Sequence, residues 1–306
     1  MAVTVIGTAR GKSTRIKRVL RVLPNYLFVL PYLIIFAVLS AGPLGYTAYM
    51  SLFKRSLFGD NPPYVGLDNY RNLWSDSLWL TVLHNTVEFV IITVLGITVV
   101  SLGAALLVRS FQRGQTILRT IFFAPAVLSV GVVAIIFNWL YAPDSGAINY
   151  ILSLVGINKV GWTSDPNIVM PALSFATIWW NFGFPMVVFL SGLLAISPSL
   201  YEAAAIDGAG PLARFRTITL PLLRPTILFV VVTQIIAQFQ VFGQSNFISN
   251  GGPGDSSRTI IMFLQDTVWR HFKYGYGAAV AITLALIMAA ITAIQFFLLG
   301  RDVTEA

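Results

Sequence analysis

The chain has 306 residues, of which 56% are hydrophobic and only 10% are charged, and its formal net charge is +8. Soluble globular proteins carry about 25% charged residues, so this composition excludes a soluble enzyme, a disordered protein and a secreted disulfide scaffold. The sequence has no cysteine, which excludes thiol catalysis and cysteine-ligated metals, and its two histidines offer little for a metal site. The mean hydropathy of +0.77 indicates a protein of the lipid bilayer.

The first 24 residues form a basic segment before the first apolar run. Apolar residues recur in it at helical spacing, with arginines between them: Ile16, Val19, Leu20 and Leu23 alternate with Arg15, Arg18 and Arg21. This pattern predicts a helix on the anionic cytoplasmic surface of the membrane, with an unstructured basic tail as the alternative. A cleaved signal peptide is disfavoured because the following apolar run continues to Phe53, which is too long for a signal sequence.

The segment Gly7–Ser13, with the sequence GTARGKS, looks like a phosphate-binding loop. That motif requires four residues between its first glycine and the Gly-Lys pair, and only three stand here. The segment is also followed by apolar membrane sequence instead of a βαβ unit. We therefore expect that the chain does not bind and hydrolyse ATP by itself.

Six uncharged runs are long enough to cross a bilayer, which takes about 20 apolar residues per helix. They are Tyr26–Phe53, Phe89–Val108, Thr120–Pro143, Pro166–Tyr201, Pro225–Gly254 and Tyr274–Gly300. The fourth run exceeds one crossing and is predicted to contain a piece that does not span. The alternation typical of membrane barrels is absent from the sequence. We therefore predict an all-α integral membrane protein with six transmembrane helices.

Six spans place both termini on the same side of the membrane. Most of the 20 Lys and Arg residues fall on that side, whereas the cations of the opposite side are matched by aspartates. Because loops on the cytoplasmic side are enriched in Lys and Arg, both termini are predicted to be cytoplasmic. This bias explains the positive net charge without a nucleic-acid partner.

One acidic residue, Glu88, lies near the outer end of the second run, just after His84. An acid within a membrane is a candidate functional group, but we favour a hydrated or hydrogen-bonded residue at a helix end. Proton-coupled carriers have relays of buried acids, and the sequence has none. An ATP-independent secondary transporter is therefore a remote alternative, and a membrane-embedded enzyme is disfavoured because no catalytic cluster is present.

The connection from Ile196 to Pro225 has the features of a short helix that projects into the cytoplasm. Ser199 and Glu202 have the spacing of a capping box, which predicts the start of a helix there. Gly208 suits the left-handed position that ends a helix, and Pro211 prevents the helix from continuing.

This connection resembles the EAA loop of binding-protein-dependent ABC importer permeases. The matching residues are Glu202-Ala203-Ala204, Asp207-Gly208-Ala209, Phe215, Leu220-Pro221 and Pro225. Four further stretches extend the resemblance to the carbohydrate permeases, the group of the maltose and glycerol-3-phosphate permeases: Val65–Trp74, Asn85-Thr86, Ile248–Thr259 and Tyr274-Gly275-Tyr276-Gly277. The resemblance implies a type I ABC importer permease fold. One departure is that the first span opens directly after the basic tail, without the extra helices and large external domain of the maltose permease, so the chain looks like the compact six-helix form.

The resemblance also implies a domain plan and a set of partners. Residues 1–24 would be the basic segment, 25–300 the permease domain with the coupling loop at 197–216, and 301–306 a short tail. The partners would be a second homologous permease subunit, two ATP-binding cassette subunits and an extracellular or periplasmic solute-binding protein, in a prokaryotic cytoplasmic membrane. ATP and Mg²⁺ would bind to the ATPase subunits, and this chain would be non-catalytic. The coupling residues would be Glu202, Ala203, Ala204, Asp207, Gly208 and Ala209.

Amide and aromatic side chains in the predicted spans suit a neutral saccharide, which is bound by amide hydrogen bonds and aromatic faces. The candidates for the solute pathway are Asn138, Trp179, Trp180, Asn181, Gln234, Gln238 and Phe242. Hydrogen bonding between neighbouring helices is the alternative role for each of them. A phosphorylated solute would favour a cation at mid-depth, and these spans have none. We therefore expect an importer of a sugar or oligosaccharide, with glycerol 3-phosphate, a polyol or another small polar solute as the alternative.

Overall fold

The structure is a computed structural model that describes residues 28–56, 61–111 and 113–299. Within these ranges the chain is helical, and the β pairing is limited to an isolated bridge between Phe53 and Tyr64. The predicted all-α class is therefore confirmed. The basic segment 1–24, with its predicted surface helix and its GTARGKS sequence, and the tail 301–306 lie outside the described residues.

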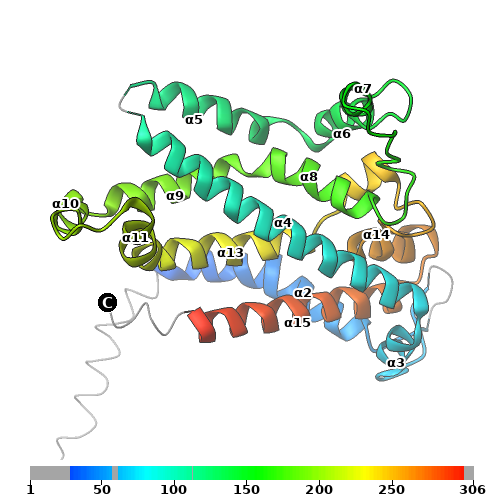
Figure 1. Cartoon of the computed structure of the whole chain (residues 1–306). Helices are drawn as coiled ribbons and strands as arrows, with labels where there is room; N and C mark the ends of the chain where they lie inside the picture. The colour runs from blue at the N-terminus through cyan, green and yellow to red at the C-terminus, as the bar shows by residue number, and fades with distance from the viewer. Residues whose placement is uncertain (1–27, 57–60, 112, 300–306) are drawn as a thin grey trace, which may run out of the picture.

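Long helices run side by side along the molecule, and short helices lie at its two ends (Figure 1). The long helices are Phe28–Met50, which contains α2 (Gly42–Met50), then α4 (Ser77–Ser110), α8 (Val169–Asn181), α9 (Gly183–Ala195), α13 (Arg224–Phe239) and α15 (Tyr274–Leu299). One end carries α10 (Pro198–Ile206) and α11 (Pro211–Arg214); the other carries α3 (Asp68–Ser75), α7 (Ala147–Leu154) and α14 (Ile260–Gln265). The dark-blue start of the first helix and the red end of α15 lie at the end that carries α10.

Three described helices are long and apolar enough to cross a membrane alone: Phe28–Met50, Ser77–Ser110 and Tyr274–Phe297. Three further candidates are bent pairs. They are Gln115–Val127 with Val130–Leu140, at 95°; Val169–Asn181 with Gly183–Ala195, at 53°; and Pro211–Leu222 with Arg224–Phe239, at 65°. The described chain thus has three continuous spans, or up to six if each bent pair is one span. The number six and the direction of the spans remain predictions.

Two helices differ from the apolar runs at their boundaries. α4 starts well before Phe89, because Oδ1 of Asp76 caps it by accepting the N–H groups of Leu78 and Trp79 at 2.9 and 3.4 Å. The run Pro225–Gly254 does not form one helix: α13 ends at Phe239, and the glycines and proline that follow give a loop with a short π-helical segment, η4 (Ser245–Ser249). Neither the cap at Asp76 nor the end of α13 at Phe239 can be predicted by counting uncharged residues.

The bend between α8 and α9 is fixed by contacts with two other helices. Pro185 has no N–H group and cannot complete the helical hydrogen-bond pattern at the joint. A Cβ on Gly183 would lie 2.6 Å from the carbonyl oxygen of Phe122, so glycine permits α5 (Gln115–Phe123) to approach closely. On the other side, the hydroxyl of Ser101 in α4 donates to the carbonyl of Phe182 at 2.8 Å.

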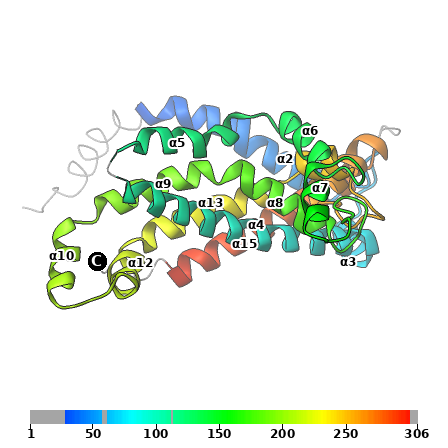
Figure 2. The ribbon, with the colours of Figure 1, turned by 45° about the horizontal axis from the view of Figure 1, so that its top comes forward.

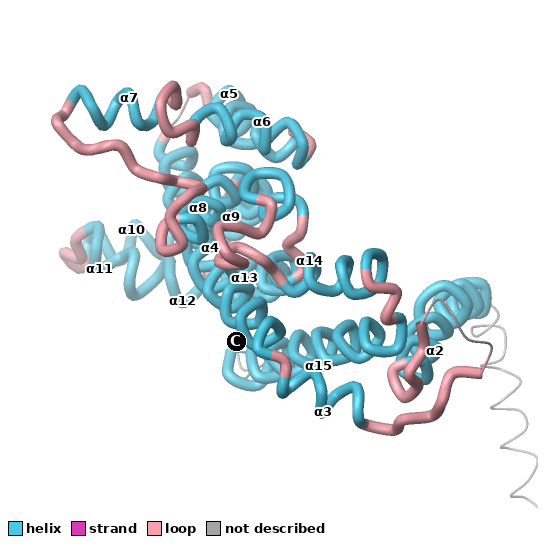
Figure 3. The backbone as a smooth tube through the Cα atoms, turned by 90° about the vertical axis from the view of Figure 1, so that its right-hand side faces the viewer, coloured by secondary structure: helices cyan, strands magenta, loops and turns pink. Residues whose placement is uncertain are grey.

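α4 is the central helix of the described fold, since it contributes to all three hydrophobic clusters. Trp79 and Val82 belong to the cluster near α3 and α14, Phe89 to the cluster near α6 (Val130–Leu140), and Val108 to the cluster near α9. Figure 3 views the end opposite α10, where loops and the short helices α3, α7 and α14 surround the ends of the long helices. One end of the molecule therefore carries the projecting α10, whereas the other is covered by loops and by the short helices α3, α7 and α14.

Candidate functional sites

The predicted coupling loop forms α10 and α11, and α10 projects beyond the long helices (Figure 2). The capping box predicted from Ser199 and Glu202 is wrong. α10 begins before Ser199, with Ser197 at the N-cap and Pro198 as its first residue, a position that suits the fixed backbone angle of proline. Ser199 therefore lies inside the helix, where its hydroxyl pairs with the hydroxyl of Ser197 at 2.8 Å.

The C-terminal end of α10 agrees with its prediction. Gly208 has φ +81°, the left-handed conformation that glycine adopts without strain. The N–H of Gly208 donates to the carbonyl of Ala205 at 3.1 Å, and the N–H of Ala209 donates to that of Ala204 at 2.8 Å. This pair of bonds closes the helix end. Pro211 was predicted to prevent α10 from continuing, and in the structure it is also the first residue of the next helix, α11.

The outer surface of α10 combines exposed acids with exposed apolar side chains. Glu202 and Asp207 are both exposed. Ile206 and Leu200 of α10 are 87% and 46% exposed, and Leu212 of the neighbouring α11 is 62% exposed. Exposed apolar side chains beside exposed acids make this projecting turn a candidate surface for contact with another protein. These three residues stand beside the EAA residues in the sequence, but their exposure follows only from the fold.

The structure places Gln234 and Gln238 together inside the fold. Both are buried in α13, and Nε2 of Gln238 donates to Oε1 of Gln234 at 3.1 Å. The bond joins residues of the same helix, so it satisfies part of each amide without linking two helices. The remaining donor and acceptor atoms of the two amides give this part of α13 a polar character in an apolar surrounding.

The other pathway candidates lie around α6 and the loop after α13. Asn138 is exposed and donates to the carbonyl of Phe247 at 3.0 Å, and Phe242 contacts the Phe247 ring edge to face at 6.4 Å. Trp179 packs edge to face on Phe137 at 5.6 Å. Trp180 donates from its indole nitrogen to the carbonyl of Leu128 at 3.1 Å, and Asn181 is half-buried at the end of α8.

These contacts bring together some of the candidates and leave others apart. Asn138 and Phe242 meet at Phe247, whereas Gln234 and Gln238 pair only with each other among the described residues. Phe242 also lines a largely apolar cavity of about 470 Å³ between the first helix, α14 and α15. No hydrogen bond or ring contact of the described chain joins the glutamine pair to the tryptophans.

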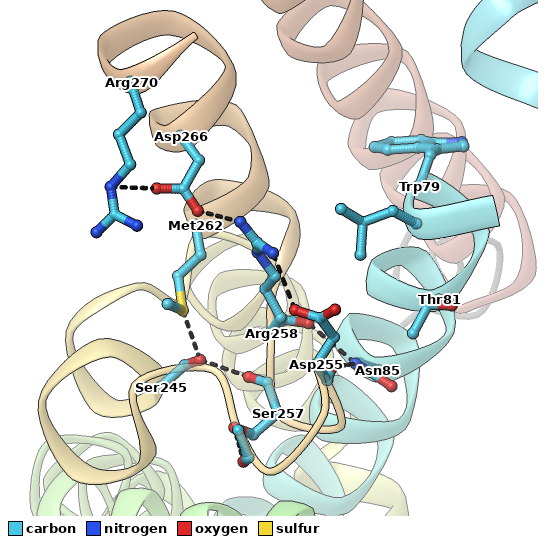
Figure 4. A network of polar contacts seen from close by, with 12 residues as sticks. Trp79, Thr81, Asn85, Ser245, Asp255, Ser257, Arg258, Met262, Asp266 and Arg270 are labelled. Carbon is cyan, nitrogen blue, oxygen red and sulfur yellow. Dashed lines mark hydrogen bonds and ion pairs between the residues drawn. The ribbon is translucent and has the colours of Figure 1, made fainter. Parts of the chain in front are cut away.

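At the end opposite α10, a polar network joins segments that are far apart in the sequence (Figure 4). Nδ2 of Asn85 donates to the carbonyls of Asp255 and Arg258 at 2.7 and 3.1 Å. The hydroxyl of Thr86 accepts the N–H of Ile260 at 3.0 Å. The Asn85-Thr86 pair thus holds the loop Ile248–Thr259 against α4, which gives a structural role to two of the stretches that carried the resemblance.

An ion network continues from this loop to the helix that follows. Arg258 forms ion pairs with Asp255, at 2.9 Å, and with Asp266, which also pairs with Arg270 at 2.9 Å. Burial alone would lower the pKa of Arg258, but the hydrogen bonds and charges of the two aspartates outweigh burial and raise that pKa above its ordinary value. Sequence reasoning missed this network, because only the fold brings Asp266 beside the loop.

Comparison with known families decides the class of protein. Residues 97–301 match the model of the binding-protein-dependent transport system inner membrane component family. The chain belongs to this family.

Among the described residues, no group of three or more His, Asp or Glu side chains could hold a metal ion, so the permease has no metal cluster in that part of the chain.

Curated relatives cover nearly the whole permease. The chain is 32% identical to the sulfoquinovosyl glycerol transport system permease of Agrobacterium fabrum, over 88% of this chain and 87% of that protein. It is 32% identical to the trehalose/maltose permease of Thermococcus litoralis, over 90% and 93%. It is also 33% identical to the sn-glycerol-3-phosphate permease of A. fabrum, over 90% and 94%.

Solved structures support the fold of the permease. A bacterial ABC transporter that imports the acidic polysaccharide alginate contains a chain that superposes with a TM-score of 0.78, at 22% identity, over 93% of this chain and 98% of that one. A second structure, of a bacterial alginate transporter in complex with an alginate-bound periplasmic protein, gives a TM-score of 0.76 at 22% identity, over 91% and 94%. The predicted ABC importer permease fold is confirmed.

Proposed function

We propose that the chain is one permease subunit of an ATP-driven, binding-protein-dependent importer of a sugar or oligosaccharide. It would form half of the translocation pathway, in the cytoplasmic membrane of a prokaryote. A second homologous permease would supply the other half, and a solute-binding protein would deliver the solute from outside. ATP and Mg²⁺ would bind to two separate ATPase subunits, so that the permease itself carries out no catalytic step.

The observation that carries this proposal is the projecting α10–α11 turn. It lies at the end of the molecule where the first helix begins and α15 ends, as expected for a cytoplasmic loop in a protein whose termini are cytoplasmic. Glu202 and Asp207 offer carboxylates, and Ile206 offers an apolar side chain that is 87% exposed. A partner that buries this surface removes the apolar area from water. We assign the coupling role to Glu202, Ala203, Ala204, Asp207, Gly208 and Ala209.

A neutral saccharide is the solute class that the polar side chains favour. The buried amides of Gln234 and Gln238 and the rings of Trp179, Trp180 and Phe242 supply hydrogen bonds and flat apolar faces. The sequence of α13 has no charged residue between Arg224 and its end, and α8 and α9 have none at all. Transport of trehalose and maltose by one relative agrees with this class.

A solute with an anionic group is the second candidate. Relatives named for sn-glycerol 3-phosphate and for sulfoquinovosyl glycerol are about as similar to this chain as the trehalose/maltose permease. An anionic solute would then need a cation from the second permease, since the long helices named above supply none at mid-depth.

The test is an affinity purification of the chain from detergent-solubilised membranes, with the co-purifying proteins identified by mass. We expect a second permease and a P-loop ATPase. If the chain is recovered alone and moves solute in proteoliposomes without ATP, the ABC importer assignment fails and a secondary carrier replaces it.

A pair of variants tests the coupling role. Gly208→Asp places a side chain at a residue with φ +81°, which strains the turn after α10, whereas Gly210→Asp adds the same side chain at φ −70°, and both positions are open. We expect Gly208→Asp to uncouple ATP hydrolysis from uptake while the protein still folds, and Gly210→Asp to remain close to wild type. Wild-type uptake by Gly208→Asp would contradict the coupling assignment.

A further inference from the structure

α10 is nearly free of the rest of the permease. Of its nine residues, Tyr201 and Ala204 are half-buried and the others are exposed. Along the chain, α10 is joined to the rest of the permease by the short segment after α9 and by the turn at Gly208. A side-chain contact would join α10 to the long helices in addition to these two links.

Tyr201 provides that contact, and it does so to two elements at once. Its hydroxyl lies 2.9 Å from the hydroxyl of Thr219, which is buried at the end of η3 (Phe215–Thr219), the segment that leads through α12 (Leu220–Leu222) to α13. The guanidinium of Arg109, in the last turn of α4, lies over the Tyr201 ring at 5.0 Å from its centre, and Nη1 donates to the hydroxyl at 3.4 Å.

We infer that Tyr201 is a positioning residue that transmits displacement of α10 to α4 and to the segment leading into α13. A hydrogen bond fixes a distance and a direction, and a cation over an aromatic face fixes the plane of the ring. Together they join α10 to the central helix α4 and to the first limb of the bent pair that ends in α13. The inference rests on the proposed coupling function of α10, which it deepens by naming the side chain through which coupling passes.

The test uses the complex of the permease with its co-purified ATPase, reconstituted in liposomes. The probe is the solute-binding protein purified with its own bound solute. Two quantities are measured: the ratio of ATP hydrolysis with and without this protein, and the amount of ATPase recovered per permease. The ratio reports communication through the permease, whereas a merely structural role would change the recovery or the thermal stability.

Two variants remove the same hydrogen bond from opposite ends. Tyr201→Phe keeps the ring under Arg109 but removes the hydroxyl, and with it the longer bond from Arg109 at 3.4 Å; Thr219→Val removes the other hydroxyl and leaves the Arg109 bond in place. A neutral hydrogen bond changes an equilibrium by about 2- to 10-fold, so we expect each variant to lower the stimulation ratio by about that factor. The double variant should lose little more than the stronger single variant, because both share one bond.

Thr217→Val is the matched control. Thr217 belongs to the same segment η3, is exposed, and its hydroxyl donates to the carbonyl of Ala213 at 2.8 Å instead of to a residue of α10. We expect its stimulation ratio and its ATPase recovery to equal those of the wild type. An unchanged ratio in Tyr201→Phe overturns the inference, and so does a loss that only follows the amount of ATPase recovered.

Gly208→Asp in the same assay separates this inference from the proposed function. If Gly208→Asp loses the stimulation of ATP hydrolysis and Tyr201→Phe keeps it, α10 couples ATP hydrolysis to transport, but this coupling does not pass through Tyr201. If Gly208→Asp keeps full stimulation, or no ATPase co-purifies with the wild type, the coupling role of α10 is itself wrong, and the role of Tyr201 falls with it.

Discussion

The amide of Asn85 in α4 donates to the main-chain carbonyl of Asp255 at 2.7 Å, although 170 positions separate the two residues in the sequence. The same amide reaches the carbonyl of Arg258, and its neighbour Thr86 accepts the N–H of Ile260. One turn of the central helix thus determines where the loop after α13 lies and where α14 begins. Because Asn85 is only 5% exposed, water does not replace these bonds readily.

Replacement of this amide should destabilise the end of the permease opposite α10. Asn85→Ala leaves two carbonyl groups without their donor, and we expect a loss of about 1–3 kcal/mol in the free energy of unfolding. Thr81→Ala is the control, because Thr81 is exposed on the same helix and donates only to the carbonyl of Ser77, and its effect should stay within about 0.5 kcal/mol. Thermal unfolding in detergent compares the two, and equal losses would contradict the role of Asn85.

The ion network predicts a difference between two of its members. The Asp266 side chain is 10% exposed and pairs with Arg258 and Arg270, whereas the Arg270 side chain is 74% exposed. Asp266→Asn removes one carboxylate from the partly buried Arg258 and should cost about 1–3 kcal/mol. Arg270→Gln removes only an exposed cation and leaves Asp266 paired with Arg258, so it should cost less than about 1 kcal/mol. If the two variants unfold at the same temperature, the network does not stabilise the permease in this way.

Two glycines in the long helices should respond differently to replacement by alanine. Gly183→Ala places a Cβ 2.6 Å from the carbonyl oxygen of Phe122, and overpacking of this kind costs about 1–3 kcal/mol. Gly103 lies in α4 with nothing near the position of its Cβ, so Gly103→Ala should be neutral or stabilise the helix by up to about 1 kcal/mol. Thermal unfolding of both variants checks the expectation, and a stable Gly183→Ala variant would show that α5 can move away.

Gln238 separates a role in the solute pathway from a role in the helix. We expect Gln238→Ala to lose at least about tenfold in uptake while basal ATP hydrolysis remains, because a solute hydroxyl would lose its partner. Gln240→Ala, at an exposed residue directly after α13, should keep its uptake. The measurement is uptake of the solute that the purified binding protein carries, normalised to folded complex. Unchanged uptake in Gln238→Ala would leave the residue with a role only in its contact with Gln234.

The sequence predicted the class of protein and several local features correctly. Charge content depends on composition and apolar runs depend on the local order of residues, so both identified a helical protein of the membrane without any tertiary information. The turn at Gly208 was also predictable, because the left-handed conformation excludes most other residues locally. Where two local signals competed, as at Ser199 and Pro198, the sequence did not show which residue would start the helix.

The tertiary structure decided the features that depend on contacts between distant segments. Apolar runs do not reveal the bends at Gly183 and before α13, since a bend arises from a close neighbour or a missing N–H group and hardly changes hydropathy. The same holds for Asn85 with Asp255, and for Tyr201 with Arg109 and Thr219. A polar side chain in an apolar fold must find a partner, but only the packing of the helices determines which partner is within reach.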